Sequence, residues 1–391
     1  MRLIFRGDFF TVSFKKHFSN ITDKTIIYSL FASIFLPFYI TAIIIIASCF
    51  YIILKKRIVG AFEKNGSIWV ILFAIYLFAV SIINFNFIGL GCGLFFIGII
   101  IIAKFIRKHI TAEIFEKGLD ITCIMAVITA FVCLIDFIYH QFILSSKGTY
   151  RSTLYFGNSN YLATLFATVI VICGYKLLNH YRKSIIYYVV ALFCAIGAYF
   201  TGSMFVWVEV FIGCSALLLL TRRHQMLSAL FLLAGTFIIV LYCMPDIMPR
   251  INESNITTDN RITIWSTTLK AIKDATPFLG KGFMAYYHIM DLYPGSYYTG
   301  HSHSIFLEPI LDFGIIGTLM LVVYFCYFYK RVTLCKNAQH KFCISSLIIA
   351  FSLAIVVHGT TDLTFIWIQT GLFYALIFAS IGIEEKLLKI D

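Results

Sequence analysis

Charged side chains are scarce in this sequence. Only 13% of its 391 residues are Asp, Glu, Lys or Arg, whereas 60% are hydrophobic. A soluble domain carries nearly twice that share of charge. The composition therefore excludes an ordinary soluble fold and predicts an all-α polytopic membrane protein. No stretch of ordinary domain size remains outside the apolar runs, so we expect one integral membrane domain over residues 1–391.

Paired cysteines and a cleavable leader are also missing. The 11 cysteines include no CxxC pair, and most of them lie inside apolar runs. This pattern argues against a disulfide framework or a zinc site and is typical of small buried hydrophobic residues. The N-terminus lacks the short apolar region and the small-residue cleavage site of a signal peptide.

What the sequence has instead is a series of apolar runs. A first run over residues 25–54 contains Pro37 and is longer than one span needs, so we expect a short hairpin that turns near Pro37. Further spans are expected at 68–83, 87–106, 119–144, 161–178, 185–200, 204–220, 226–244, 304–328, 342–357 and 363–383. The total is about 12 transmembrane helices, with about 11 as the alternative.

Lys and Arg are unequally divided between the two sides of the predicted membrane. If the polar stretch over residues 245–303 lies outside, the inner segments hold 24 and the outer segments 7 of the 31 basic residues. Cytoplasmic segments of membrane proteins are enriched in such residues. We therefore expect both ends of the chain inside and a long extracytoplasmic loop over residues 245–303. The same asymmetry accounts for the net charge of +12 without nucleic acid as a partner.

The long loop contains the pattern of an amphipathic helix. Asp259 or Asn260 is expected to cap this helix, and Pro277 with the glycines that follow is expected to end it. One face is formed by Arg261, Trp265, Thr268, Leu269 and Ile272. The helix either lies at the membrane interface with Trp265 as its anchor, or it directs Arg261 into an outer cleft that binds an anion.

Two histidines and two acids gather where the loop meets the next apolar run. His301 and His303 precede the run, and Glu308 and Asp312 lie one turn apart within it. Simple interfacial hydrogen bonding would explain a single histidine, but ionisable groups at membrane depth are costly and indicate a functional site. A neutral histidine can take a proton from a hydroxyl group. The histidine pair could also bind a metal, but the sequence places no third ligand, so we expect none.

More polar residues fall on the same predicted side. Arg151 ends an outer loop, and Asn158 and Asn160 are expected to cap the span that follows. Asp362 lies at the outer end of the last pair of runs, where it either caps a helix or partners His303. Arginine binds pyrophosphate as a fork and stabilises charge on a leaving phosphate. The set therefore suits glycosyl transfer from a lipid-pyrophosphate donor without nucleotide or metal, and the tyrosines between Tyr286 and Tyr298 offer faces for sugar rings.

These motifs resemble those of the bacterial O-antigen ligases and O-antigen polymerases (the WaaL and Wzy group). The shared pattern is an Arg-x-x-x-Trp helix, a Pro-x-x-Gly-x-Gly turn, a His that opens a span and an acidic residue before Gly-x-x-Gly. Here these motifs occupy residues 261–265, 277–282, 303–307 and 312–317. The segment from Arg151 to Asn160 resembles the outer-loop Arg and turn of that group, and Thr361-Asp362 matches a Ser-Asp of some ligases.

Two positions depart from the family pattern. Ser304 stands where the family commonly has Asn, and Met204 stands where ligases and many polymerases have Arg. Arg250 is the candidate that replaces the missing guanidinium. The departure at Met204 favours a polymerase over a ligase.

The resemblance implies a metal-independent, inverting glycosyltransferase without cofactors. Its donor would be a polyprenyl-pyrophosphate-linked oligosaccharide, its acceptor a glycan or a lipid core, and a chain-length regulator is considered as a further partner. The site would face outward from the bacterial cytoplasmic (inner) membrane. His303, rather than His301, is the expected base. The expected pyrophosphate-binding residues are Arg151, Arg261 and Arg250, and the expected supporting residues are His301, Asp312, Asp362, Asn158, Asn160 and Trp265.

The alternative function is a flippase or transporter for lipid-linked oligosaccharide. A flippase would carry charged residues along its spans, in a cavity open to both sides. Apart from Asp136 and Glu209, the predicted spans are nearly free of acids and bases. The polar residues gather instead at the outer side, which favours an enzyme.

Overall fold

The computed structural model describes residues 21–58, 67–144, 150–179, 184–247, 254–274, 277–337 and 343–389. These residues form helices and connecting loops, and no strand occurs among them. The predicted all-α class is therefore confirmed for the described part of the chain. Arg250, one of the predicted anion-binding residues, lies outside the described residues.

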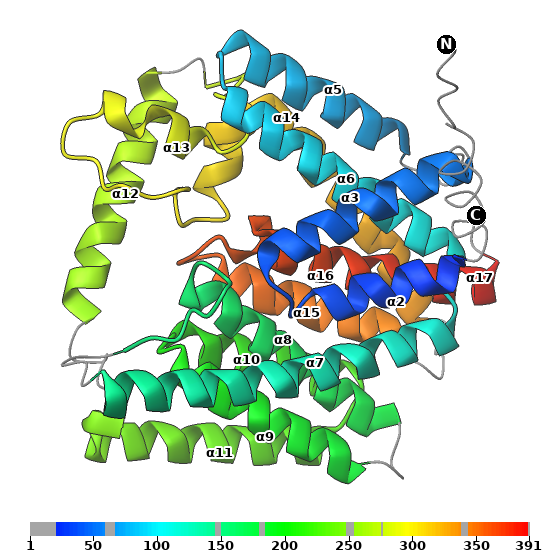
Figure 1. Ribbon diagram of the computed structural model, residues 1–391, viewed down its shortest axis with the longest axis vertical. Coiled ribbons are helices and arrows are strands. Elements are labelled where there is room, and N and C mark those ends of the chain that lie inside the picture. The colour runs from blue at the N-terminus through cyan, green and yellow to red at the C-terminus, as the bar shows by residue number, and fades with distance from the viewer. Residues whose placement is uncertain are drawn as a thin grey trace, which may run out of the picture.

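The helices before the polar loop largely follow the apolar runs (Figure 1). They are α2 (Asp23–Ser33), α3 (Phe38–Leu54), α5 (Ser67–Ile83), α6 (Phe87–His109), α7 (Ala112–Ile138), α8 (Ser159–Asn179), α9 (Ser184–Phe200), α10 (Phe205–Leu220) and α11 (His224–Cys243). Helices α2 and α3 are separated by a turn that ends at Pro37, as the first run predicts. Across this turn, the Thr41 hydroxyl donates to the Ser33 carbonyl at 2.7 Å.

The helices from the polar loop onward are α12 (Ser254–Asp274), α13 (Ala285–Ile289), α14 (Leu307–Asn337), α15 (Ile344–His358), α16 (Ile368–Ala379) and α17 (Ile381–Leu388). The expected span over residues 363–383 is wrong in its first part. Asp362 and the residues after it form a loop and a short 3-10 turn (Thr364–Ile366) before α16 begins. The loop forms because the backbone after α15 bends back, with the Asp362 N–H donating to the His358 carbonyl at 3.1 Å.

Apolar surface dominates the exterior. Among the described residues, α6, α7 with its short continuation to Ile143, α8, α11 and α14 are each long and apolar enough to cross a membrane. The shorter apolar helices are α3, α5, α9, α10 and α15. Large hydrophobic side chains such as Leu232 and Ile43 remain exposed on them. Because water would not tolerate so much exposed apolar surface, the helices are consistent with a polytopic membrane protein.

Helix α12 starts earlier than predicted. It begins at Ser254, so Asp259 and Asn260 lie within the helix instead of capping it. Its inner face is buried rather than free at an interface, since Ile264 and Ala271 pack with Tyr286 of α13 and Leu311 of α14. Figure 1 shows α12 crossing one end of the helical bundle, with α13 beside it and α17 at the far end.

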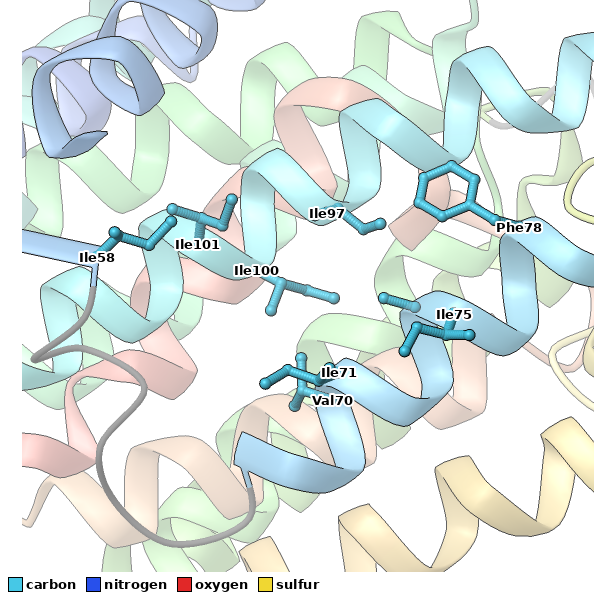
Figure 2. Close-up of a pocket in the computed structure, with 9 residues that line it drawn as sticks. Ile58, Val70, Ile71, Ile75, Phe78, Ile97, Ile100 and Ile101 are labelled. Atoms are coloured by element: carbon cyan, nitrogen blue, oxygen red, sulfur yellow. The ribbon is translucent and has the colours of Figure 1, made fainter. Parts of the chain in front are cut away.

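The core centres on α8, which is buried along most of its length and lies among α7, α9, α10 and α15. The first turn of α8 therefore meets the loop after α15, at the end of the bundle that we call the polar end. A separate groove between α5 and α6 is lined only by apolar side chains, including Ile71, Ile75, Ile97 and Ile100 (Figure 2). That groove offers no group for chemistry, so the candidate site lies elsewhere.

Candidate active site

A buried carboxylate, that of Asp362, connects the polar residues at this end of the bundle. Its Oδ1 atom lies 2.9 Å from Nδ1 of His303. Asn160 donates to its Oδ2 at 2.6 Å, and the Leu363 N–H donates to its Oδ1 at 2.7 Å. Burial opposes ionisation, but His303 and the neighbouring histidines outweigh it and hold the pKa of Asp362 well below its ordinary range. Because donors surround it, Asp362 is an ionised acceptor.

Two distant loop segments meet to form the site. The Ile305 N–H, just after the histidine pair, donates to the Gly359 carbonyl at 2.7 Å. A Cβ atom at Gly359 would lie 2.8 Å from the Cβ of Ile305, so only glycine permits this approach. The contact holds His303 against Asp362.

His303 presents its second ring nitrogen on the other side. Its backbone has a φ of +53°, which is uncommon for a residue with a side chain. Nδ1 lies 2.9 Å from the ionised carboxylate without meeting the geometry of a hydrogen bond. The nearby negative charge favours the proton on Nδ1, which leaves a lone pair on Nε2. Nε2 lies 3.0 Å from the Thr299 hydroxyl, and the side chain is 17% exposed. His303 thus holds a basic nitrogen at the accessible side of the site.

His301 is a different kind of histidine. It is buried, and its Nδ1 accepts the backbone N–H of His303 at 3.1 Å. Burial lowers the pKa of His301 to about 3, assisted by His303 and opposed by Asp362. The ring is therefore neutral, with its proton on Nε2, which lies 3.1 Å from the Tyr161 hydroxyl. Such a ring orients its neighbours but is a poor base.

The same three residues could in principle hold a metal ion. One ligand atom from each of His301, His303 and Asp362 lies within 4.8 Å of the others, so the structure supplies the third ligand that the sequence did not place. A metal on Nε2 of His301 would require the ring proton on Nδ1. That atom instead accepts a backbone N–H. In this tautomer Nε2 of His301 carries a proton and is not available as a metal ligand.

Arg151 and Asn160 support Asp362 from below. The guanidinium of Arg151 donates to the Asn160 side-chain oxygen at 2.8 Å and to the Thr201 carbonyl at 2.9 Å. This fixes the amide of Asn160, so its NH2 group faces Asp362. The expectation that Asn160 caps α8 is wrong, because its side chain is used here. Asn158 does cap α8, accepting the Asn160 N–H at 2.8 Å.

Arg261 is a second arginine whose charge acts on Asp362. It is half-buried on α12, and its charge interacts with that of Asp362. Burial lowers the pKa of Arg261, and Asp362 opposes that effect. Trp265, one turn further on, packs against the cluster of α12, α13 and α14, which includes Tyr286. Arg151 thus holds Asn160 against Asp362, and Arg261 interacts electrostatically with the same carboxylate. Trp265 belongs instead to the cluster of α12, α13 and α14.

Asp312 belongs to a neighbouring junction. Its carboxylate accepts the backbone N–H groups of Ala285 at 2.8 Å and Met284 at 3.3 Å. Gly314 interrupts α14 with a φ of +62°, and a Cβ atom at Gly280 would lie 2.4 Å from the Gly314 nitrogen. The two glycine motifs are therefore halves of one contact that anchors the loop before the histidines.

The junction is held from outside the motifs as well. Asn86 donates to the Phe283 carbonyl at 2.9 Å, and Asn84 donates to the Gly280 carbonyl at 3.2 Å. The Tyr76 hydroxyl donates to the Phe313 carbonyl at 2.8 Å. No sequence pattern pointed to these residues, because each acts through a contact with a distant backbone.

The two departures from the family motifs have local explanations. The Ser304 hydroxyl accepts the backbone N–H groups of Phe306 and Leu307, each at 3.3 Å, so it supports the turn that opens α14. Asn and Ser are both suited to such a role. Met204 precedes α10, and the Arg151 side chain lies against Gly202 in the turn before it, with Nε 3.4 Å from the Cβ position. A guanidinium is therefore present close to the position that lacks one.

A second buried pair lies beneath the site. Glu209 of α10 contacts Nδ1 of His358 at 2.6 Å, and the Thr164 hydroxyl lies 3.0 Å from the same nitrogen. His358 is the residue whose carbonyl accepts the Asp362 N–H. The rarity of acids in the spans singled out Glu209, but its partner could not be read from the sequence.

The comparison with known families agrees with the motifs. Residues 189–322 match the model of a family described as O-antigen ligase. The matched segment runs from α9 into α14 and includes Arg261, His303 and Asp312, while Arg151 and Asp362 lie outside it. The search of curated proteins found no match.

The matched family implies glycosyl transfer of the O-antigen ligase or polymerase type in a membrane. Together with the apolar helices, it supports an integral membrane protein with a role in surface polysaccharide synthesis. Over residues 189–322, the chain is similar to the family described as O-antigen ligase.

Proposed function

We propose that this protein transfers a glycan from a polyprenyl pyrophosphate to the hydroxyl group of an acceptor sugar. The observation that carries the proposal is the contact of 2.9 Å between His303 and the buried Asp362. Asp362 fixes the proton on Nδ1 and leaves Nε2 as the base, an arrangement suited to general-base catalysis.

The reaction is a single displacement. Nε2 of His303 takes the proton of the acceptor hydroxyl as its oxygen attacks the anomeric carbon of the donor. The bond between that carbon and the pyrophosphate oxygen breaks, and the electron pair leaves with the polyprenyl pyrophosphate. One displacement inverts the configuration at the anomeric carbon. The Asp362 charge stabilises the imidazolium that forms.

Arginine side chains would stabilise the leaving group. Arg261 is half-buried and lies within electrostatic range of Asp362, so a pyrophosphate bound beside it would be close to His303. Arg151 adds positive charge behind Asn160, which donates to Asp362. Reduced solvent screening makes these charges more effective than exposed ones. Arg250 stays the proposed third donor.

The proposed site needs neither nucleotide nor metal. The hydrogen bond that holds Nδ1 of His301 opposes metal binding, and arginine supplies the positive charge that a metal would otherwise provide. We therefore expect full activity in EDTA. Loss of wild-type activity in EDTA, restored by a divalent cation, would instead support a metal held by His301, His303 and Asp362.

The reaction is proposed to occur on the outer side of the bacterial cytoplasmic membrane, with both chain ends inside. Within the superfamily, Met204 in place of the ligase-like Arg favours a polymerase, in which case the acceptor is another lipid-linked glycan. A deletion strain distinguishes the two activities. Glycan with a single repeat on its final anchor indicates a lost polymerase, whereas polymer that stays on the carrier lipid indicates a lost ligase.

The alternative of a flippase fits the placement of charge less well. The buried acid Glu209 pairs with His358, directly below the Asp362 turn. It therefore supports the polar end of the bundle rather than a path through it.

The proposal is tested with purified protein and its lipid-linked donor. General-base catalysis contributes about 10²–10⁴ in rate, so His303→Ala should nearly abolish glycan transfer while donor binding persists. His301→Ala is the matched control and should cost less, because His301 orients the site without taking the proton. Normal turnover by His303→Ala would remove the mechanism.

A further inference from the structure

Nε2 of His303, the atom proposed to act as the base, faces a hydroxyl group of the protein itself. Thr299 Oγ1 lies 3.0 Å from Nε2 of His303. The negative charge of Asp362, 2.9 Å away, favours the imidazole proton on Nδ1, and in that tautomer Thr299 donates to Nε2. A hydroxyl that donates to this nitrogen has the geometry required of a nucleophile in the proposed reaction.

Aromatic side chains lie next to Thr299. Tyr298 is 69% exposed, and its hydroxyl donates to that of Tyr287 at 3.3 Å. The two rings meet edge to face, with centroids 6.0 Å apart. The Tyr286 hydroxyl also donates to the Tyr297 carbonyl at 3.0 Å, and this hydrogen bond holds the loop segment that carries Thr299. An exposed tyrosine ring therefore stands one residue away from the hydroxyl on the base.

We propose that Thr299 and the Tyr287–Tyr298 pair form the acceptor subsite. In this subsite the Thr299 hydroxyl occupies the position of the acceptor hydroxyl until a sugar displaces it, and the Tyr298 ring receives the face of that sugar. The ligand class is a pyranose residue of a lipid-linked oligosaccharide. The inference rests on the proposed function, because it assigns the substrate that His303 deprotonates.

The Thr299 hydroxyl on Nε2 of His303 protects the donor from hydrolysis in this proposal. With donor bound and no acceptor present, water at Nε2 would attack the anomeric carbon and pass its proton to His303. The bond to pyrophosphate would break, and the products would be free reducing glycan and polyprenyl pyrophosphate. While Thr299 occupies Nε2, water is excluded from that position, and the donor is spared.

The test measures how the donor is divided between transfer and hydrolysis. The probe is undecaprenyl-pyrophosphate-linked oligosaccharide extracted from cells that lack this protein, and the readout is the ratio of free reducing glycan to extended lipid-linked glycan. Thr299→Ala leaves room for water, so this ratio should rise by about two- to tenfold, the effect of one net hydrogen bond. Thr299→Ser keeps the hydroxyl and should restore the wild-type ratio.

Three further variants distinguish loss of the subsite from general damage to the fold. Thr236→Val removes an exposed hydroxyl that bonds only within α11 and should leave the ratio unchanged. Tyr298→Ala should raise the KM for the lipid-linked substrate as acceptor, whereas Tyr298→Phe, which keeps the ring, should not. An unchanged ratio in Thr299→Ala, or equal effects of the two Tyr298 variants, would overturn the proposed subsite.

The test of His303 as the base is independent of the test of the acceptor subsite. If His303→Ala abolishes both transfer and hydrolysis while Thr299→Ala behaves as wild type, the proposed function stands and the acceptor subsite is wrong. If His303→Ala retains both reactions, the proposed function itself fails.

Discussion

Replacing Asp362 with asparagine tests the central contact with almost no change in shape. An asparagine oxygen can accept from Leu363 or His303, but its NH2 group would then face the NH2 group of Asn160, which donates to Asp362 at 2.6 Å. Asn160 cannot turn its amide around freely, because its oxygen accepts from Arg151 at 2.8 Å. The substitution therefore creates two facing donors in a buried place.

The expected cost has a structural and a catalytic part. A hydrogen bond to a charged group is worth about 1.5–3 kcal/mol, so losing the one from Asn160 should lower thermal stability by a comparable amount. The catalytic part is larger. Without the carboxylate, Nδ1 of His303 keeps only a neutral oxygen beside it, the imidazolium loses its counter-charge, and the wrong tautomer becomes accessible. We expect transfer to fall by about 10²–10⁴ with donor affinity retained.

The assay compares initial rates of glycan transfer by purified Asp362→Asn and Asp291→Asn. Asp291 is an exposed acid in the loop over residues 245–303, so its variant controls for the loss of one negative charge. In a His303→Ala background, Asp362→Asn should cause no further loss of rate, because residues that act as a unit are not additive. Equal rates for the two asparagine variants, or full additivity with His303→Ala, would refute the reasoning.

Three further predictions concern binding, topology and stability. Arg261→Lys should clearly impair transfer, since a point charge does not replace a bidentate fork; full activity would make Arg261 a packing residue. A cysteine in place of Ser254 should react with an impermeant maleimide in cells whose outer membrane has been permeabilised. The background is Cys243→Ser, because Cys243 is itself exposed and would also react. Labelling only after lysis would reverse the predicted topology. Gly280→Ala should destabilise the protein far more than Gly295→Ala in a thermal-stability assay. Both glycines have a φ near +77°, but a Cβ atom at Gly280 meets backbone at 2.4 Å whereas one at Gly295 meets nothing within 4 Å; equal effects would mean that the α14 junction is not tightly packed.

Composition predicted the helical class because apolar content is a property of the whole chain. The motif residues were also readable, since Arg261, His303 and Asp312 each stand in a short pattern. What the sequence could not supply was the pairing of segments. The contact between Asn160 and Asp362 joins the first turn of α8 to the distant loop after α15, and nothing local distinguishes Asn160 from a helix cap.

The wrong expectation for Asn160 has a physical cause. Asn160 was given a local hydrogen-bonding role, because side chains of this type often cap helices. In the folded chain, the buried end of the bundle offers Asn160 two charged partners, Arg151 and Asp362, which are stronger than a backbone N–H. For Asp362, the structure shows the expected contact with His303. The junction at Gly280 and Gly314 was hidden for a related reason, because two turn-like motifs were assigned separately although each leaves the space that the other fills.

The charges at the site explain why an acid and arginines occur together. If the site only had to bind pyrophosphate, positive charge alone would bind it most tightly, and a buried carboxylate nearby would weaken that binding. During transfer, however, His303 gains a proton while negative charge moves onto the leaving phosphate. A site with arginines alone would resist that protonation, because the imidazolium would form beside like charges. Asp362 lies against His303 at 2.9 Å, where it offsets the imidazolium directly, while Arg261 faces the leaving group in the proposed arrangement. On this reasoning the carboxylate is needed for the acceptor half of the reaction and the guanidinium for the donor half, so Asp362→Asn should spare donor binding where Arg261→Lys weakens it.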